Sequence, residues 1–176
     1  MTLTMLGIVL IMIVVVLPTG LCSYNPGNSD GGVVTPVDEK TFLGMEANTT
    51  AFPLVVPATP EGWTANSARR STVGQVQAPV VGYVTDDEGY LQLTQTDVTL
   101  DDAVRDVDPD PREQIRTEDI EGTEVHVFHS KESDVRDIWA FERDGVTFLV
   151  SGSAADEEFR ELVSATLQGA PAKVGS

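Results

Sequence analysis

Hydrophobic residues occur in two kinds of pattern along this chain. Residues 1–22 carry no charge, and their centre, residues 6–17, is an almost uninterrupted aliphatic run with no polar face at helical spacing. As a helix, residues 1–22 would span roughly 33 Å, about the thickness of the hydrocarbon core of a bilayer. We therefore expect a transmembrane helix over residues 1–22. Further along, short apolar runs are separated by turn-forming residues, which is typical of strands.

Three interpretations of the N-terminal run are open, and its flanking residues favour one of them. A cleaved signal peptide needs small residues just before its cleavage site, which the stretch around Gly20 does not provide. A lipid-modified Cys22 needs a small residue before it, but Leu21 stands there. A retained signal anchor needs neither, so we expect residues 1–22 to lie in the lipid bilayer as a single-pass anchor. No Lys or Arg precedes the aliphatic centre of this segment. We expect the few residues before it to stay in the cytoplasm, which places the rest of the chain on the extracytoplasmic side of the cell membrane.

Composition divides the rest of the chain into a linker, one domain and a tail. Residues 23–37 are dominated by Gly, Pro, Asn and Ser, which is typical of a flexible linker. Residues 38–170 are long enough for a single extracytoplasmic domain with its own core. After Gly169 has ended the last helix, we expect residues 171–176 to form a disordered tail.

Within the domain, apolar alternation and turn residues predict strands joined as hairpins. Strands are expected over residues 64–72, 80–85, 90–96, 122–130, 137–142 and 146–151. The Asp-Gly pair at 144–145, between two apolar runs, is a strong hairpin signal. The two runs that flank this pair are apolar on both faces, so the sheet needs at least one helix packed on it.

Helices are predicted at three places in the domain. Residues 38–47 favour a short helix with Asp38 as N-cap and with Phe42 and Met45 on one side, and residues 101–107 favour another. The longest begins after Ser153 as N-cap, and the residues of its expected packing face recur at helical spacing: Phe159, Leu162, Val163, Thr166 and Leu167. The sequence therefore predicts an α+β fold. An N-terminal transmembrane helix is followed by a mostly antiparallel β-sheet with the C-terminal helix packed on one face.

Charge narrows the range of partners. The chain has 11 basic and 28 acidic side chains, a formal net charge of -17, and every charged residue lies after Ser29. This surplus of acid argues against nucleic acid as a partner.

The single cysteine excludes an internal disulfide and a Cys-based zinc site. The glycine-rich motifs for phosphates and dinucleotides are missing, so no cofactor is expected. The basic pair Arg69 and Arg70 is interpreted as a solvated strand edge.

The acidic segment 101–120 holds the weak candidates for a metal site. Asp106, Asp108 and Asp110 resemble the start of a calcium loop, but Pro111 and Thr117 stand where an EF-hand needs Gly and Glu. A solvated acidic loop is the interpretation that we favour for this segment. The two histidines, His126 and His129, lie three residues apart on an expected strand, where they point to opposite faces and cannot easily share a metal.

Aromatic residues offer a second candidate site. Trp63, Tyr83 and Tyr90 could line a ligand cleft, although a domain with only 6% aromatic residues needs most of them in its core. A serine nucleophile is not indicated, because no G-x-S-x-G motif is present and Ser130, beside His129, gives no triad geometry by adjacency alone.

Taken in order, several segments resemble one family, the actinobacterial single-pass membrane proteins called domain of unknown function 4245. The resemblance covers nearly the whole chain and rests on the aliphatic anchor with its Pro/Gly linker, Phe52–Pro57, Pro60–Trp63, Val81–Thr85, Tyr90–Gln95, and Gly145–Ala154 with the helix that follows. It implies an envelope location and a small α+β domain. It implies no activity and no catalytic residue.

These observations favour a non-enzymatic role in binding or assembly in the cell envelope, with an envelope protein or a ligand as partner. One alternative is an extracytoplasmic hydrolase, which would need two carboxylates converging in a cleft with separated pKa values. The other is a weak divalent-cation binder built on the acidic segment.

Overall fold

The computed structural model describes residues 35–108 and 110–173. The expected anchor at 1–22 and nearly all of the expected linker lie outside these residues. The elements in chain order are α2 (Glu39–Glu46), β1 (Val55–Val56), β2 (Thr64–Val73), β3 (Val76–Val84), β4 (Tyr90–Thr96), α3 (Leu100–Asp106), β5 (Glu113–Ile120), β6 (Thr123–His129), β7 (Asp137–Arg143), β8 (Val146–Ser153), α4 (Asp156–Leu167) and β9 (Ala170–Pro171). None of the helices in the described ranges is long and apolar enough to cross a membrane.

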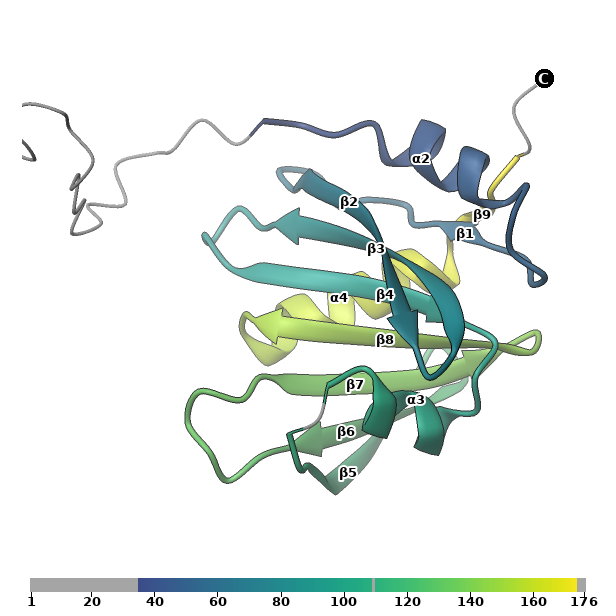
Figure 1. The fold of residues 1–176 in the computed structure, drawn as a ribbon. Helices are drawn as coiled ribbons and strands as arrows, with labels where there is room; N and C mark the ends of the chain where they lie inside the picture. The colour runs from purple at the N-terminus through teal and green to yellow at the C-terminus, as the bar shows by residue number, and fades with distance from the viewer. Residues whose placement is uncertain (1–34, 109, 174–176) are drawn as a thin grey trace, which may run out of the picture. The chain divides into compact units, whose positions relative to one another are not determined.

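A seven-stranded antiparallel sheet in the order β2-β3-β4-β8-β7-β6-β5 forms the centre of the domain (Figure 1). It consists of two meanders, β2-β3-β4 and β5-β6-β7-β8, which meet where β4 pairs with β8. The β7–β8 hairpin turns at Asp144 and Gly145, which both have positive φ, as the Asp-Gly signal predicts. The predicted α+β class and antiparallel sheet are therefore confirmed.

One face of the sheet carries the larger core and is covered by α4, which lies behind the sheet in Figure 1. We call this the α4 face. Trp139 at its centre is fully buried and stacks on Phe159 of α4, with ring centroids 5.3 Å apart. Leu162, Val163 and Leu167 of the same helix are buried beside them. The helical spacing of apolar residues in α4 thus packs one stripe of the helix on the sheet, as predicted.

The opposite face carries a smaller core under α3, and we call it the α3 face. Ala103 and Val104 of α3 cluster with Phe128, Ile138 and Leu149 from β6, β7 and β8. The helix has only seven residues and packs on β7 and β8. The strands β7 and β8 are therefore covered on both faces, which explains why their sequences are apolar throughout.

The segment before the sheet is fixed to the α4 face through α2 and a two-stranded sheet of β1 and β9. Asp38 caps α2 as predicted, because its side chain accepts a hydrogen bond from the Thr41 N–H. The expected apolar side of α2 is wrong, since Leu43 is fully buried and Met45 is 56% exposed. Pro171 and Ala172, at the start of the expected tail, belong to the fold instead, because β9 pairs with β1 and the Ala172 N–H donates to the Leu54 carbonyl.

Two further differences from the sequence prediction concern element boundaries. Helix α4 begins at Asp156, because the β4–β8 ladder runs to Ser153, which is a strand residue and not the N-cap. The Ala155 N–H at the cap position donates instead to the Glu158 carboxylate, at 2.7 Å. Strand β5 was expected to be an acidic loop. It forms because β6 offers it a ladder of hydrogen bonds, although its own side chains are mostly polar.

Candidate functional site

A polar groove of about 440 Å³ lies on the α3 face, beside the small core under α3. Its floor is made by side chains of β2, β3, β4, β7 and β8, and its wall by the α3–β5 segment and the β6–β7 loop. The groove therefore collects side chains from parts of the chain that are far apart in sequence. Strands supply the floor, so the groups there are held rigidly.

Two arginines distinguish this groove from the rest of the acidic domain. Of the eight arginines in the chain, six have a carboxylate oxygen within 4.0 Å: Arg70, Arg105, Arg112, Arg116, Arg143 and Arg160. In the described part of the chain, Arg69 and Arg136 have no such partner, and both line the groove. Because acids outnumber bases so strongly, two unpaired guanidinium groups in one groove give it a distinct electrostatic character.

Each of these guanidinium groups contacts an uncharged side chain that orients it. The Arg69 Nη2 donates to the Gln92 Oε1 at 2.9 Å, across strands β2 and β4. The Arg136 guanidinium lies 5.8 Å from the centroid of the Tyr90 ring, a cation–π arrangement. Tyr90 is itself fixed, because its hydroxyl and the Ser67 hydroxyl are 3.3 Å apart, within hydrogen-bond distance. Both cations are thus oriented by neutral groups, so neither has its charge neutralised.

Gly82 allows this arrangement. It lies between Ser67 and Gln92 in the ladder of β2, β3 and β4. A Cβ on Gly82 would overlap both the Tyr90 hydroxyl and the Ser67 hydroxyl. A side chain at this position would therefore displace the ring on which Arg136 rests.

Arg112 joins the two loops that form the wall of the groove. Its side chain is only 2% exposed, and it donates to the Arg136 carbonyl at 2.8 Å, to the Asp110 carbonyl at 3.0 Å and to the Asp108 carboxylate at 2.8 Å. The guanidinium thus links the α3–β5 segment to the β6–β7 loop. This link holds the backbone of Arg136 in position.

Asp108 and Asp110 form an interacting pair of carboxyls on the groove wall. The hydrogen bond from Arg112 holds the pKa of Asp108 below its ordinary value. The pKa of Asp110 is raised, mainly by its interaction with Asp108 and further by desolvation. Two acids with opposite shifts therefore share one side of the groove.

The structure brings two of the three expected cation ligands, Asp108 and Asp110, to the groove, but Arg112 binds the carboxylate of one of them. Asp108 already pairs with Arg112, and Asp106 lies nearest to Arg105, at 4.0 Å. Within residues 35–108 and 110–173, no group of three His, Cys, Asp or Glu side chains is close enough to hold a metal ion. A guanidinium thus takes the place that a cation would have at Asp108.

The three aromatic residues expected to line a cleft do not meet. Trp63 is 8% exposed and Tyr83 is fully buried, and both belong to the core of the α4 face. Tyr90 lies on the opposite face, beside the groove, because it pairs with Val84, whose side chain points away from that of its neighbour Tyr83. Only Tyr90 is therefore close to the groove.

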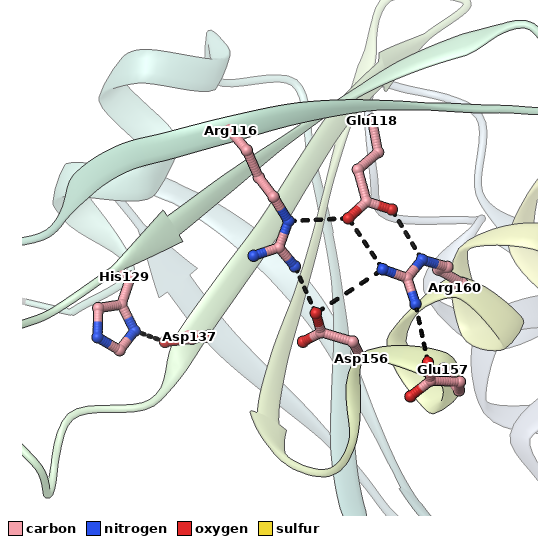
Figure 2. Close-up of polar contacts among 7 residues, drawn as sticks. All are labelled: Arg116, Glu118, His129, Asp137, Asp156, Glu157 and Arg160. Carbon is pink, nitrogen blue, oxygen red and sulfur yellow. Dashed lines mark hydrogen bonds and ion pairs between the residues drawn. The ribbon is translucent and has the colours of Figure 1, made fainter.

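The two histidines point to opposite faces of β6, as the sequence predicts. The His126 Nδ1 is 3.0 Å from the Gln114 amide nitrogen, and the His129 Nδ1 is 2.6 Å from the Asp137 carboxylate (Figure 2). The side chain of Ser130 is buried, and its hydroxyl accepts a hydrogen bond from the Glu132 N–H. The His129–Asp137 pair is therefore not continued by Ser130 into a triad.

Figure 2 also shows a charged cluster between β5 and α4, on the α4 face. Glu118 accepts hydrogen bonds from Arg116 at 2.8 Å and from Arg160 at 2.8 and 3.0 Å. The two guanidinium groups lie 5.1 and 5.4 Å from the centroid of the buried Trp139 ring. All the hydrogen-bonding partners are internal, so this cluster fastens β5 to α4 and covers the core.

The fold, then, is a small α+β domain with a seven-stranded sheet and a two-stranded one, helices on both faces of the larger sheet and a polar groove on the α3 face. The family model described as Protein of unknown function (DUF4245) matches residues 1–166, and the chain belongs to this family. Searches of the curated proteins and of the solved structures gave no significant match. The family carries no assigned activity, so function has to be argued from the groove itself.

Proposed function

We propose that this chain is a single-pass membrane protein whose acidic domain lies outside the cytoplasm and binds a ligand in the cell envelope without chemical conversion. The groove on the α3 face is the binding site in this proposal. The observation that carries it is the pair Arg69 and Arg136, two guanidinium groups in one groove with no carboxylate within 4.0 Å in the described part of the chain.

Most arginines of this chain have a carboxylate partner within the domain. With 28 acids in the sequence, a pairing carboxylate is easily provided, and six arginines have one. A cation kept unpaired beside a concave polar surface is available for an external anion. Gln92 and Tyr90 fix both groups before any ligand arrives, and such preorganisation lowers the entropic cost of binding.

Photo-crosslinking in living cells tests the binding role. A photoreactive benzophenone amino acid would replace Ser71, which lines the groove, and in a matched variant it would replace the exposed Gln168 on the other side of the sheet. We expect a discrete mass adduct at the groove position alone, identified by mass spectrometry. Adduct patterns that are the same at both positions, or no adduct at Ser71, would contradict a binding role for the groove.

The membrane part of the proposal rests on the uncharged segment at residues 1–22, with its aliphatic centre, and needs its own test. In a Cys22→Ser background, Glu61→Cys places one thiol at an exposed turn of the domain. We expect a membrane-impermeant maleimide to label this thiol in intact cells. Labelling only after lysis would place the domain on the cytoplasmic side and overturn the proposed topology.

A second candidate function is an extracytoplasmic hydrolase that uses Asp108 and Asp110. Both carboxyls line the groove, and their pKa values are moved in opposite directions, as an acid–base pair requires. Nitrophenyl glycosides provide the assay. If this candidate is right, turnover is lost in Asp110→Asn and kept in Asp87→Asn, which changes an exposed turn. No turnover by the unmodified chain at any pH would remove the candidate.

A further inference from the structure

We propose that the groove recognises an oxyanion carried on a polyhydroxylated framework, as in a sugar acid or a sugar phosphate. This inference rests on the proposed binding function and names the chemistry of the ligand. It is carried by the arrangement of Arg69, Arg136 and the polar groups between and around them.

The two guanidinium groups define the anionic part of the ligand. Arg69 uses one N–H for Gln92, and Arg136 lies against the Tyr90 ring. A guanidinium has five N–H donors in a planar fork, so most of them remain for a bidentate contact with a carboxylate or phosphate. The contact is charge-assisted and is therefore stronger than a hydrogen bond between neutral groups.

The other groups define the hydroxylated part. Gln92 and Ser151 lie opposite each other on β4 and β8 in the groove, and they offer an amide and a hydroxyl. Asp110 and Asp134, also in the groove, have carboxyl groups that accept hydrogen bonds from ligand hydroxyls. A ligand with both an oxyanion and hydroxyl groups satisfies the arginines and the acids together.

Size and charge exclude the simpler alternatives. A volume of about 440 Å³ lies within the range of small-molecule sites, roughly 300–1,000 Å³, and a lone inorganic ion would leave most of it unfilled. A densely charged polyanion would meet Asp108, Asp110 and Asp134 on the wall and an overall charge of -17. A neutral polyol that carries one or two anionic groups fits both the volume of the groove and the negative charge around it.

Isothermal titration of the full-length chain in detergent micelles tests the ligand class with four probes: glucose 6-phosphate, glucuronate, glucose and inorganic phosphate. We expect the first two to bind at least about tenfold more tightly than the last two, because only they use both halves of the groove. Nanodiscs with phosphatidylinositol or phosphatidylcholine then separate a lipid headgroup from a soluble sugar phosphate as the source. Preference for the inositol lipid identifies the headgroup.

Variants show whether binding uses the groove. Arg69→Gln and Arg136→Gln are each expected to weaken glucose 6-phosphate and glucuronate by about tenfold or more. Lys131→Gln removes the same unit of charge from a side chain that is 83% exposed outside the groove, and it should leave both affinities unchanged. Equal loss in all three variants would reveal a general charge effect and overturn the proposal.

The ligand class and the binding function can fail separately. If none of the four probes binds but the photoreactive group at Ser71 still captures a discrete ligand, the ligand class is wrong and the groove remains a binding site. If inorganic phosphate alone binds as tightly as glucose 6-phosphate, the polyol part is wrong. If neither titration nor crosslinking gives a signal, both proposals fall.

Discussion

The side-chain carboxamide of Gln95 makes two hydrogen bonds to the backbone of Val55, as a neighbouring strand would. The Val55 N–H donates to the Gln95 Oε1, and the Gln95 Nε2 donates to the Val55 carbonyl, both at 2.8 Å. Gln95 is only 1% exposed. The carboxamide therefore replaces a missing β-strand between β1 and β4, and it connects the small two-stranded sheet to the large one.

Replacing Gln95 by Leu should destabilise the domain by about 2–4 kcal/mol, because both backbone groups of Val55 lose a buried partner. Urea unfolding followed by circular dichroism measures the change. Gln77→Leu, at an exposed position on β3, serves as the control and should stay within about 0.5 kcal/mol of the unmodified chain. A neutral effect of Gln95→Leu would mean that water replaces the carboxamide at no cost.

Glu118 should make the stability of the domain depend on pH in the acidic range. Its pKa is lowered below the usual 4.5, first by the hydrogen bond from Arg160 and then by that from Arg116. The unfolded chain therefore binds a proton more readily than the folded one. The stabilisation is fully present above about pH 4.5 and is lost as the pH falls through the lower folded-state pKa.

Glu118→Gln should lower the free energy of unfolding at neutral pH by about 1–3 kcal/mol and flatten its decline below about pH 4.5. Trp139, beneath the two arginines that bind Glu118, provides a fluorescence signal for unfolding. The control is Glu113→Gln on the same strand, which affects a side chain that is 72% exposed. An unchanged acid profile in Glu118→Gln would contradict this assignment.

Tyr83 should make stability depend on pH at the alkaline end. Burial, then the charge of Glu39 and the hydrogen bond to it, raises the pKa of Tyr83 far above the usual 10.0. The stabilisation is present below pH 10.0 and is lost as the pH rises above it, because the unfolded chain ionises first. Thr59 also donates to Glu39, at 2.6 Å, so this carboxylate has two hydroxyl donors.

Tyr83→Phe should cost about 1–3 kcal/mol at neutral pH, because the buried Glu39 loses one donor. The same variant should show a smaller loss of stability between neutral and strongly alkaline pH than the unmodified chain. Thermal unfolding at both pH values measures this difference. Tyr90→Phe retains Tyr83 and should keep the full alkaline loss, so equal behaviour of the two variants would refute the role of Tyr83.

The sequence predicts the fold wherever local pattern and final environment agree. Strands β7 and β8 are apolar because both of their faces are covered, and α4 is amphipathic because one stripe of it packs on the sheet. Strand β5 escapes prediction because Arg116 and Glu118 occupy its core-facing positions. Asp156 and Arg160 of α4 pair with these two charges, and the Arg116 side chain covers Trp139, an arrangement that becomes visible only in three dimensions.

The groove could be predicted only in part. Asp108 and Asp110 are noticeable in the sequence because they lie in one acidic segment. Arg69 and Arg136 are 67 residues apart, and only the order of the strands brings them to one groove. Arg70, adjacent to Arg69, binds Glu46 instead, so the basic pair is divided between two faces of the sheet.

The pairing of β4 with β8 also determines when the domain can form. The two meanders each consist of neighbouring hairpins, but the ladder that joins them pairs residues as distant in sequence as Tyr90 and Ser153. Strand β1 can pair only after β9 has been synthesised. Such distant pairings slow folding, since the loop must close before the contacts form. A chain emerging from the ribosome should therefore resist proteolysis only after β8 and α4 have emerged. Nascent chains of increasing length, stalled and treated with protease, would show whether protection arises at this late point or already with the first meander.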